Sequence, residues 1–576
     1  MKQFIIILVA LCASSVASGQ NEANWWFFGD FAGIDFNTGI PVATTVGQLQ
    51  TLEGCASIAD PCGALLFYTD GITVWDSSHQ VMVNGNGLLG DPSSTQSAIV
   101  IPQPASTTRY YIFTVGDNFP RTGLNYSVVD MTLNGGLGAI VPGQKNINLL
   151  ADSTEKVTAA VSATGDSAWI LSYGEEVAGS GNFNSFYAFK LTASGMDLAA
   201  TVRSTFNNVQ TADRRGYLRI SPDGAAIAMM TQQFVDATNV NETARGAWFF
   251  RFNNATGAVF NAQRLQFPSG LHAYGTEFST DNSKIYVDLN TAQSGIAGDR
   301  TLVQYDRTNP SFTTTPVTIY QTDVTDPSDD VSRGGLQLGP NGSIYYTRKN
   351  TQWLSTITNP NAAGAAAGFV LDGFMVDAST TVQEGLPPFY NAFFNPSFQF
   401  VEGCARASTS FTADGIASCP GSSVIWDFGD PASGAANSST ATNPSHVYNA
   451  TGTYTVTLLI RTIRGVYSST KQVTIANSPV VNTIAPIVLC DDSSNDGVVP
   501  VDGTAIIATA LGTQSAAIFQ GTIHSSLQDA TADFNALPPT FQATTGTYYV
   551  RLDSRDSNGC FETIPFTITI NDLPTA

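Results

Sequence analysis

The phrase LRISPDGAAIAMM, residues 218–230, consists of a short apolar run, a four-residue turn and a second apolar run. Three further copies follow the same plan: AVSATGDSAWILSY from Ala160, EFSTDNSKIYVDL from Glu277 and QLGPNGSIYYTRK from Gln337. The spacing of the four copies is 59, 58 and 60 residues. Looser copies, SIADPCGALLFYTD and AIVIPQPASTTRYYIFTV, bring the series to about six members, which indicates a repeat architecture. The first turn residues of the four clear copies are Ser162, Ser221, Ser279 and Gly339.

A second hairpin follows each clear phrase, as in WFFRFNNATGAVF from Trp248, so each repeat contains four strands. Apolar and polar residues alternate within these segments, which places one side of each strand in a core. A four-stranded unit cannot bury both faces alone, and stacking around an axis leaves only short edges exposed. We therefore predict an all-β chain that begins with a six- or seven-bladed β-propeller over residues 20–400. An open β-solenoid is the alternative, although solenoid turns are shorter than about 50 residues and lack paired hairpins.

The two ends of the repeat region are incomplete repeats. NWWFFGDFAGIDFNTG, from Asn24, is similar to the second hairpin of a repeat without the first, and GLPPFYNAFFNPSF, from Gly385, ends the region. We expect the ring to close by combining both ends in one blade.

Length and charge limit the classes of function. The chain has 576 residues, more than one hydrophobic core of about 250 to 300 residues can organise, so two or more domains are expected. With 46 Asp and Glu against 25 Lys and Arg, the formal charge is -21. Because a phosphate backbone would be repelled and no basic stripe is present, nucleic acid is excluded as a partner. An acidic surface suits divalent cations, neutral glycans or basic protein patches, or simply keeps a secreted protein soluble.

The N-terminus has the order of a secretory signal: Lys2, the apolar run Phe4–Ala13 and small residues that end at Gly19. We predict cleavage after Gly19, which assigns residues 1–19 to the signal. Cys12 lies inside the apolar run, but the bulky residue before it suits lipoprotein processing badly, so a lipid anchor is a minor alternative. No later run reaches the roughly 20 apolar residues of a membrane helix, which predicts a secreted or cell-surface protein without a membrane-spanning segment.

Six cysteines remain after removal of the signal, an even number in an oxidising compartment where disulfides persist. They fall into three local couples, which predicts the bridges Cys55–Cys62, Cys404–Cys419 and Cys490–Cys560. Zinc binding is the competing interpretation. Disulfides are favoured because no two of these cysteines have the gap of a zinc knuckle, and none has a histidine at ligand spacing.

The stretch after the repeats carries VIWDFGD, NPSHVY and GTYTVTL in this order. Trp426 and Phe428 share one face of a strand, and Val456 belongs to an alternating later strand that would meet them in a core. This order resembles the PKD domain, an immunoglobulin-like β-sandwich, and we assign residues 401–477 to it. We expect His446 to be structural, because no second ligand or nucleophile lies near it in the sequence.

Residues 478–576 run from LCDDSSNDGVVPVDG to TGTYYVRLDSRDSNGC and beyond, and we predict a second immunoglobulin-like sandwich module there. The module is similar to sandwich repeats of large exported surface proteins of gliding bacteria. The segments SSTQSAIVIPQP, LLFYTDGITVWD and GGLQLGPNGSIYYTRK resemble the same group, in which a WD-like propeller precedes a PKD domain and immunoglobulin-like repeats. This resemblance implies type IX secretion, adhesion or gliding motility, and further C-terminal sandwich and sorting domains beyond this chain.

The segment DSSNDG is a candidate metal site. Asp492, Ser494 and Asp496 occupy alternate positions before Gly497, as in calcium loops, where alternate side chains converge on one ion. Gly503 stands where an EF-hand has its bidentate glutamate, which excludes a full EF-hand loop. Calcium, bound tentatively by Asp492, Ser494 and Asp496, is the only cofactor predicted, and a plain acidic turn is the alternative.

No catalytic residue is predicted. The four histidines show no Ser-His-Asp or Cys-His grouping, and neither a phosphate loop nor a haem attachment motif is present. A glycosidase needs two carboxylates about 5 to 10 Å apart, a distance that sequence spacing does not reveal. One acidic loop, TDVTDPSDD, is placed between repeats to rim one mouth of the propeller, or is a solvated loop. Its carboxylates are Asp323, Asp326, Asp329 and Asp330.

These observations predict a secreted or cell-surface binding or adhesion protein without catalysis. The propeller would recognise an extracellular glycan or protein ligand, and the sandwiches would act as spacers. The alternative is an extracellular enzyme that acts on polysaccharide through an acidic site on the propeller face. Two converging buried carboxylates in the centre of the propeller would favour the enzyme.

Overall fold

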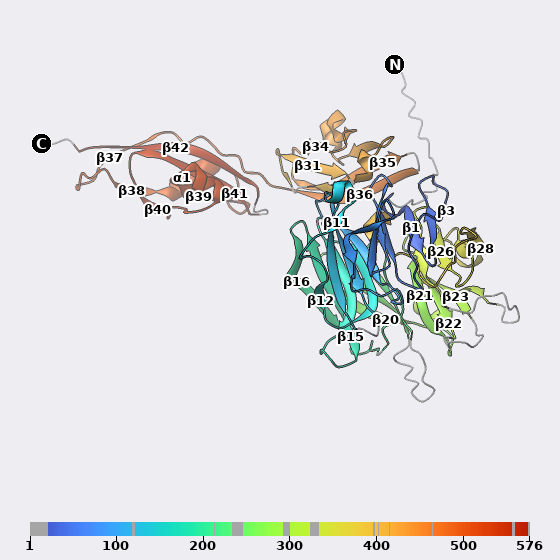
Figure 1. Ribbon diagram of the computed structural model, residues 1–576. Helices are drawn as coiled ribbons and strands as arrows, with labels where there is room; N and C mark the ends of the chain where they lie inside the picture. Colours follow the sequence, from blue (N-terminus) through green and yellow to red (C-terminus); the bar gives the residue numbers. More distant parts are fainter. Residues whose placement is uncertain are drawn as a thin grey trace, which may run out of the picture. The chain divides into compact units, whose positions relative to one another are not determined.

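The computed structural model describes residues 21–117, 121–211, 213–232, 246–291, 300–322, 333–394, 398–400, 403–413, 415–462, 465–555 and 559–573. The chain divides into two compact units. One comprises the residues up to Ser397 with Asp414–Ser422 and Ile460–Tyr467, and the other comprises Phe398–Ala413, Ser423–Leu459 and Ser468–Ala576. Both consist mainly of β-strands, as predicted (Figure 1).

The first unit contains six sheets of the predicted four-stranded kind, and neighbours within each sheet are antiparallel and follow chain order. β7 and β11 also pair in parallel, at Val83 and Ala139, and β12 (Ile147–Leu150) adds to β10, so the first two sheets are continuous. The strands of the six sheets are β4 (Ala56–Ala59), β5 (Leu65–Thr69), β6 (Thr73–Asp76) and β7 (Val81–Asn86); β8 (Ala98–Pro102), β9 (Arg109–Val115), β10 (Leu124–Asp130) and β11 (Ala139–Ile140); β13 (Ser153–Val161), β14 (Ala168–Glu175), β15 (Phe183–Thr192) and β16 (Gly195–Thr205); β17 (Leu218–Ile220), β18 (Ala226–Thr231), β19 (Gly246–Asn253) and β20 (Ala258–Leu265); β21 (His272–Phe278), β22 (Lys284–Asn290), β23 (Arg300–Asp306) and β24 (Val317–Gln321); and β25 (Leu336–Leu338), β26 (Ile344–Thr347), β27 (Trp353–Ile357) and β28 (Phe369–Met375).

A seventh sheet of three strands comes from the N-terminal part of the unit: β1 (Trp25–Phe28), β2 (Ala32–Asp35) and β3 (Val42–Thr44). β1 contacts β4 of the first full blade, and the Trp26 ring lies 5.3 Å from the Tyr345 ring of β26, edge to face. Figure 1 shows β1 and β3 beside β26 and β28. The segment after β28 adds backbone hydrogen bonds between Asp30 and Thr381. The ring therefore closes from both ends as a seven-bladed propeller, and the predicted fold class is confirmed.

The repeated phrase forms the first hairpin of a blade. In LRISPDGAAIAMM the turn between β17 and β18 contains Gly224, whose φ of +68° is a conformation that favours glycine. Along β18, Ile227 packs in one core cluster with Leu171 of the preceding blade, whereas Ala228 packs in another with Ile285 of the following blade. β18 thus buries both faces between neighbouring blades, whereas outer strands such as β16 are largely exposed. Burial of the inner strands is why the repeats must stack.

Strands β29 to β36 form a sandwich of two sheets. Its core contains Trp426 and Phe428, both buried as predicted. His446 stacks on Phe428 at 4.5 Å, and its Nε2 lies 3.1 Å from Asp430 Oδ2, so its contacts are those of a core residue. One sheet consists of β29 (Phe398–Phe400), β31 (Ser408–Ala413) and β34 (Ser445–Val447), and the other of β30 (Gly403–Cys404), β36 (Gly465–Ala476), β35 (Gly452–Thr462), β32 (Ser423–Asp427) and β33 (Ser438–Ser439).

The last module is sandwich-like, as predicted, with two short helices that the sequence does not predict. Asp502 caps the first helix, because its Oδ1 accepts a hydrogen bond from Thr504 N at 2.9 Å. Ile506 of this helix packs with Val550 and Leu552 in one core. The elements are a sheet of β37 (Ile487–Cys490), β42 (Phe561–Asn571), β41 (Gly546–Ser554) and β39 (Phe519–His524), a pair of β38 (Val499–Asp502) and β40 (Thr540–Ala543), and the helices α1 (Gly503–Leu511) and α2 (Leu527–Ala532).

The predicted disulfide pairing is wrong. The structure joins Cys62 to Cys419 and Cys404 to Cys560, with Cα–Cα distances of 5.4 and 5.6 Å, whereas Cys55 and Cys490 are free. The bridges Cys55–Cys62, Cys404–Cys419 and Cys490–Cys560 do not form, because a β-strand separates the two members of each couple. An extended strand rises about 3.3 Å per residue, and a disulfide needs Cα atoms within about 7 Å.

The couple Cys490 and Cys560 shows this effect most clearly. Cys490 pairs with Asn571 at one end of β42, and Cys560 precedes Phe561 at the other end. The length of β42 therefore holds Cys490 and Cys560 apart, and the cysteines that do bond come from remote parts of the chain.

Candidate functional site

The first strands of the blades lie around the axis of the propeller, since β13, β17, β21 and β25 contact one another in turn. The loops that lead into these strands therefore converge at one end of the axis, which we call the entry face. The segment after β28 joins them through a hydrogen bond from Glu384 N to Leu52 O at 2.8 Å. The entry face is defined by Glu53, Glu155, Arg214, Arg333 and Glu384.

An ion-pair cluster occupies the centre of the entry face. The Arg333 guanidinium donates from Nη2 to Glu53 Oε1 and from Nε to Glu384 Oε2. Lys349 Nζ donates to the second oxygen of Glu384, and Tyr274 Oη donates to the second oxygen of Glu53 at 3.0 Å. All four carboxylate oxygens are thus hydrogen-bonded, and Arg333 itself is only 15% exposed. A rearrangement that separated these groups would leave a buried charge without its partner, which is strongly unfavourable.

The two carboxylates of this cluster differ in proton affinity. Burial raises the pKa of Glu53 to about 7, against the attraction of Arg333 and with the support of the neighbouring Glu384 charge. Burial acts on Glu384 as well, but Arg333 and Lys349 together hold its pKa below the usual value. Pairs of carboxyl groups with separated pKa values can divide the roles of acid and base, although neither of these two has an oxygen without a partner.

A second ionisable pair, Glu155 and Lys156, begins β13 and is fully buried. Burial raises the pKa of Glu155 well above its usual value, and the nearby carboxylates of Glu53 and Asp117 raise it further. Burial also lowers the pKa of Lys156 to about 7, against the attraction of Glu155. Glu155 Oε2 accepts hydrogen bonds from Thr95 N and Oγ1 at 3.0 and 2.8 Å. Lys156 Nζ donates to Arg214 O and Arg215 O at 2.7 and 2.6 Å, so hydrogen bonds hold both side chains in place.

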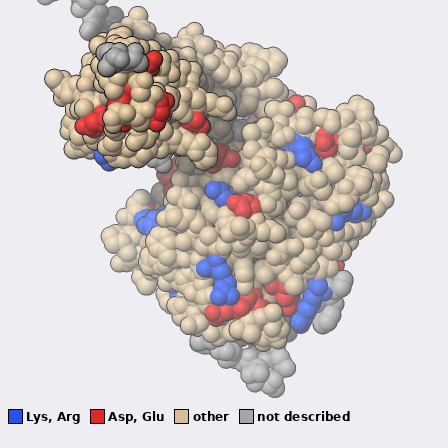
Figure 2. Space-filling model, turned by 90° about the vertical axis from the view of Figure 1, so that its left-hand side faces the viewer, with Lys and Arg blue, Asp and Glu red and all other residues tan. Residues whose placement is uncertain are grey.

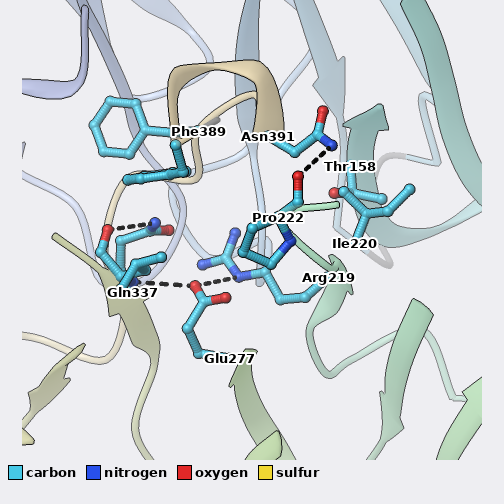
Figure 3. A pocket seen from close by; sticks show the side chains of 10 residues that line it. Thr158, Arg219, Ile220, Pro222, Glu277, Gln337, Phe389 and Asn391 are labelled. Carbon is cyan, nitrogen blue, oxygen red and sulfur yellow. Dashed lines mark hydrogen bonds and ion pairs between the residues drawn. The ribbon is translucent and has the colours of Figure 1, made fainter. Parts of the chain in front are cut away.

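A small cavity lies further along the axis, away from the entry face (Figure 3). Arg219 Nε is 3.4 Å from Glu277 Oε2, and the same oxygen accepts a hydrogen bond from Leu338 N at 3.1 Å. Asn391, which follows the last blade, donates to Pro222 O at 3.3 Å and covers the cavity from above in this view. The cavity has a volume of about 20 Å³, which is enough for one or two water molecules but not for a substrate.

The entry face was not predicted from the sequence, although several of its charged residues are followed directly by glycine. The charged residues Glu53, Arg215, Arg333 and Glu384 are each followed directly by glycine. A β carbon at Gly54 would collide with Ser97, and one at Gly385 would collide with the backbone of Glu53. Glycine is therefore required where the backbone segments crowd together at the axis, and the charged residue before it is the detectable signal.

Two groups of predicted site residues lie outside the described residues. One is the acidic loop with Asp323, Asp326, Asp329 and Asp330, and the other is the expected cleavage position after Gly19. Both stay predictions.

The candidate calcium site differs in one member from the predicted set. One oxygen each of Asp491, Asp492 and Asp496 lies within 4.8 Å of the others. Ser494 instead donates its hydroxyl to Asp492 Oδ1 at 2.6 Å, and this hydrogen bond lowers the pKa of Asp492. The structure thus brings together two of the three predicted residues and adds the buried Asp491, whose Oδ2 already accepts from Gly497 N at 2.6 Å. Calcium binding stays a prediction.

Comparison with protein families identifies the two modules after the propeller. Residues 399–476 match the PKD domain, and residues 486–574 match the Flavobacterium inter-domain disulphide bond domain. The Cys404–Cys560 disulfide joins these two modules covalently. No curated protein matches the chain significantly.

The solved structures that resemble this chain have low sequence identity and low TM-scores. The GH74 enzyme of Niastella koreensis is 10% identical with a TM-score of 0.34, over 95% of this chain and 73% of that one. A putative 6-phosphogluconolactonase from Bacteroides fragilis is 12% identical with a TM-score of 0.28, over 56% and 93%. A thermostable family-43 glycoside hydrolase is 10% identical with a TM-score of 0.27, over 50% and 87%.

Disulfide-bonded domains of these two families are typical of extracellular proteins, because disulfides persist in oxidising compartments. Within the described part of the chain, no helix has the length and apolar character needed to cross a membrane.

Proposed function

We propose that the protein is a secreted or cell-surface binding protein whose entry face recognises an extracellular glycan or protein, while the two modules after the propeller act as spacers. The observation that carries this proposal is the pairing of Arg333 with Glu53 and Glu384. A catalytic carboxyl must exchange protons with a substrate, and these two carboxylates are instead bonded at every oxygen. Such a cluster supports a rigid recognition surface.

The surface composition agrees with recognition of a ligand of low charge. Only 12% of the residues are charged, and Figure 2 shows Lys and Arg atoms in small groups beside Asp and Glu atoms, separated by wide uncharged areas. Neutral glycans are bound largely through hydrogen bonds and apolar contacts, so a surface of this kind suits them. The view also shows a group of Asp and Glu atoms at the upper left with few Lys or Arg atoms among them.

The test is a screen of the purified chain on an array of extracellular polysaccharides and glycoproteins, together with hydrolysis assays on every compound that binds. Lys349 and Arg215, each about one quarter exposed beside the cluster, are the variants of choice. We expect Lys349→Ala and Arg215→Ala to weaken binding about tenfold, the loss of about 1.4 kcal/mol. Arg203→Ala, on the exposed outer strand β16, is the matched control and should bind as the wild type does. Absence of binding across the array, or equal binding by all variants, would contradict the proposal.

A second candidate function, an enzyme that acts on polysaccharide, is supported by the proximity of Glu155 to Asp117. Burial and the nearby Asp117 raise the pKa of the Glu155 carboxyl well above its usual value, and a raised pKa suits a general acid. Glu155→Gln would then abolish hydrolysis of a bound polysaccharide and leave its binding intact. Bound polysaccharides that are never cleaved by the wild type would eliminate this candidate.

A further inference from the structure

The two disulfides interlock along the chain. Their cysteines occur in the order Cys62, Cys404, Cys419 and Cys560, and the bonds join the first to the third and the second to the fourth. Each covalent ring therefore contains one cysteine of the other bond. A chain linked in this manner has a much shorter covalent route between its ends than its backbone has.

We propose that the interlocked disulfides make this protein a tension-resistant connector, in which a load between the two ends bypasses most of the propeller and of both later modules. The shortest covalent route between Asn21 and Leu573 runs along residues 21–62, crosses to Cys419, returns to Cys404, and crosses to Cys560. This route contains about 70 residues, which span roughly 240 Å at about 3.4 Å per residue. The whole backbone between the same residues spans roughly 1,900 Å.

Most of the folded elements lie off this route. Strands β5 to β28, which complete six of the seven blades, belong to the segment between Cys62 and Cys404. Strands β32 to β41 and both helices belong to the segment between Cys419 and Cys560. None of these elements can be drawn out while both bonds hold, because the load never enters them.

The elements on the route are few. At the C-terminal end the load reaches Cys560 through β42, which pairs with β41 on one side and with β37 on the other. At the N-terminal end it passes through β1 to β4, whose Trp26 is fully buried. The segment between Cys404 and Cys419 contributes one strand, β31.

This inference goes beyond the proposed function, because it concerns force and not the ligand. Its biological value rests on the proposed function: a ligand held at the entry face would load the chain from the propeller toward Leu573, and on that path the Cys404–Cys560 bond bypasses strands β32 to β41. The mechanical claim itself depends on covalent connectivity alone. It can therefore fail while ligand recognition stands, and the reverse also holds.

The experiment stretches the whole chain between handles attached next to Asn21 and Leu573 in optical tweezers, and measures the fully extended length. We expect about 240 Å for the oxidised chain and about 1,900 Å after complete reduction. The double variant Cys404→Ser/Cys560→Ser should reach about 660 Å, and Cys62→Ser/Cys419→Ser about 1,350 Å, because each removes one crossing from the route.

Cys490→Ser is the matched control, because Cys490 is exposed and takes part in neither bond, so this variant should stop at about 240 Å. Extended length does not depend on correct folding, so a variant that folds poorly still reports its connectivity. An oxidised wild-type chain that lengthens past about 240 Å without bond reduction, or double variants that are no longer than the wild type, would overturn the proposal.

Discussion

Arg333 forms an ion pair with Glu53 across 280 residues of chain. The pair links the loop before the first full blade to the loop before the last, and Glu384, from the segment that follows the last blade, bonds to the same guanidinium. The charges at the centre of the entry face are thus paired only when the ring is closed. Closure and charge burial therefore depend on each other.

Replacement of Arg333 by methionine should destabilise the propeller strongly. Arg333→Met leaves two buried carboxylates without their cation, which costs about 3 to 5 kcal/mol of unfolding free energy. Denaturant titration followed by tryptophan fluorescence measures the loss. Arg203→Met, on an exposed outer strand, should change the unfolding free energy by less than about 0.5 kcal/mol. Equal losses in the two variants would show that the ion-pair cluster contributes no more to stability than a surface arginine does.

The stability of the propeller should depend on pH through Glu53. Burial raises the pKa of its carboxyl from 4.5 to about 7, so the folded chain keeps this proton to higher pH than the unfolded chain. The resulting stability is fully present below pH 4.5 and is lost as the pH rises toward 7, by up to about 3 kcal/mol. Denaturant titrations at pH 4.5 and 8 should show this fall in the wild type and in the exposed control Glu176→Gln. If Glu53→Gln shows the same fall, the buried carboxyl does not titrate in this range.

Ring closure should depend on Trp26. Its fully buried side chain packs against Tyr345 of the last blade, so Trp26→Ala removes an apolar contact between the two ends of the ring and should cost about 3 to 5 kcal/mol. Thermal unfolding monitored by circular dichroism checks this loss. Phe260→Ala, an exposed aromatic on β20, should leave the midpoint nearly unchanged, and a comparable shift there would argue against a special role for the closure contact.

The thiols of the chain without its signal segment should react in two stages. Cys490 is exposed and Cys55 is buried, with a thiol pKa that burial raises far above its usual value. One thiol should react with a chromogenic disulfide reagent in the native protein, and a second only after unfolding without reductant. Peptide mapping of the same sample should recover the Cys62–Cys419 and Cys404–Cys560 bridges. Recovery of bridges between the local couples would refute the pairing.

Calcium should bind weakly at Asp491, Asp492 and Asp496, with a dissociation constant on the order of 10⁻⁴ to 10⁻³ M, as in other extracellular modules. Isothermal titration of the chelator-treated chain measures this affinity. Asp491→Asn should abolish the heat signal, whereas Asp197→Asn, an exposed carboxylate on β16, should preserve it. No heat from the wild type at millimolar calcium would leave an acidic turn as the correct interpretation.

The blades and the PKD core could be predicted from the sequence because strand alternation and turn formation depend on residues that are close together in the chain. Alternation along a strand and turn residues such as Gly224 act within one repeat of about 60 residues, and the repetition itself indicates the ring. The Trp426 and Phe428 core follows from the same alternation. The helices of the last module are short, and α1 depends on the cap provided by Asp502 and on burial of Ile506, which the apolar pattern alone did not reveal.

The candidate sites were harder to predict because their members come from distant segments. Asp492 and Asp496 share one turn and were predicted, whereas the entry face combines side chains from three loops, strand β13 and the segment after the last blade. The glycines that follow Glu53, Arg333 and Glu384 indicate this face only when the crowding of the backbone at the axis is known.

Amino-acid order by itself determined the hairpins, their stacking into a ring and the sandwich core, since each follows from periodicity within a few tens of residues. Only the tertiary structure decided which cysteines bond and which charges meet: Cys62 with Cys419, Cys404 with Cys560, and Arg333 with Glu53. The physical reason is that extended strands hold sequence neighbours apart, while closure of the ring and packing of the modules bring residues together that are more than 150 positions apart in the chain.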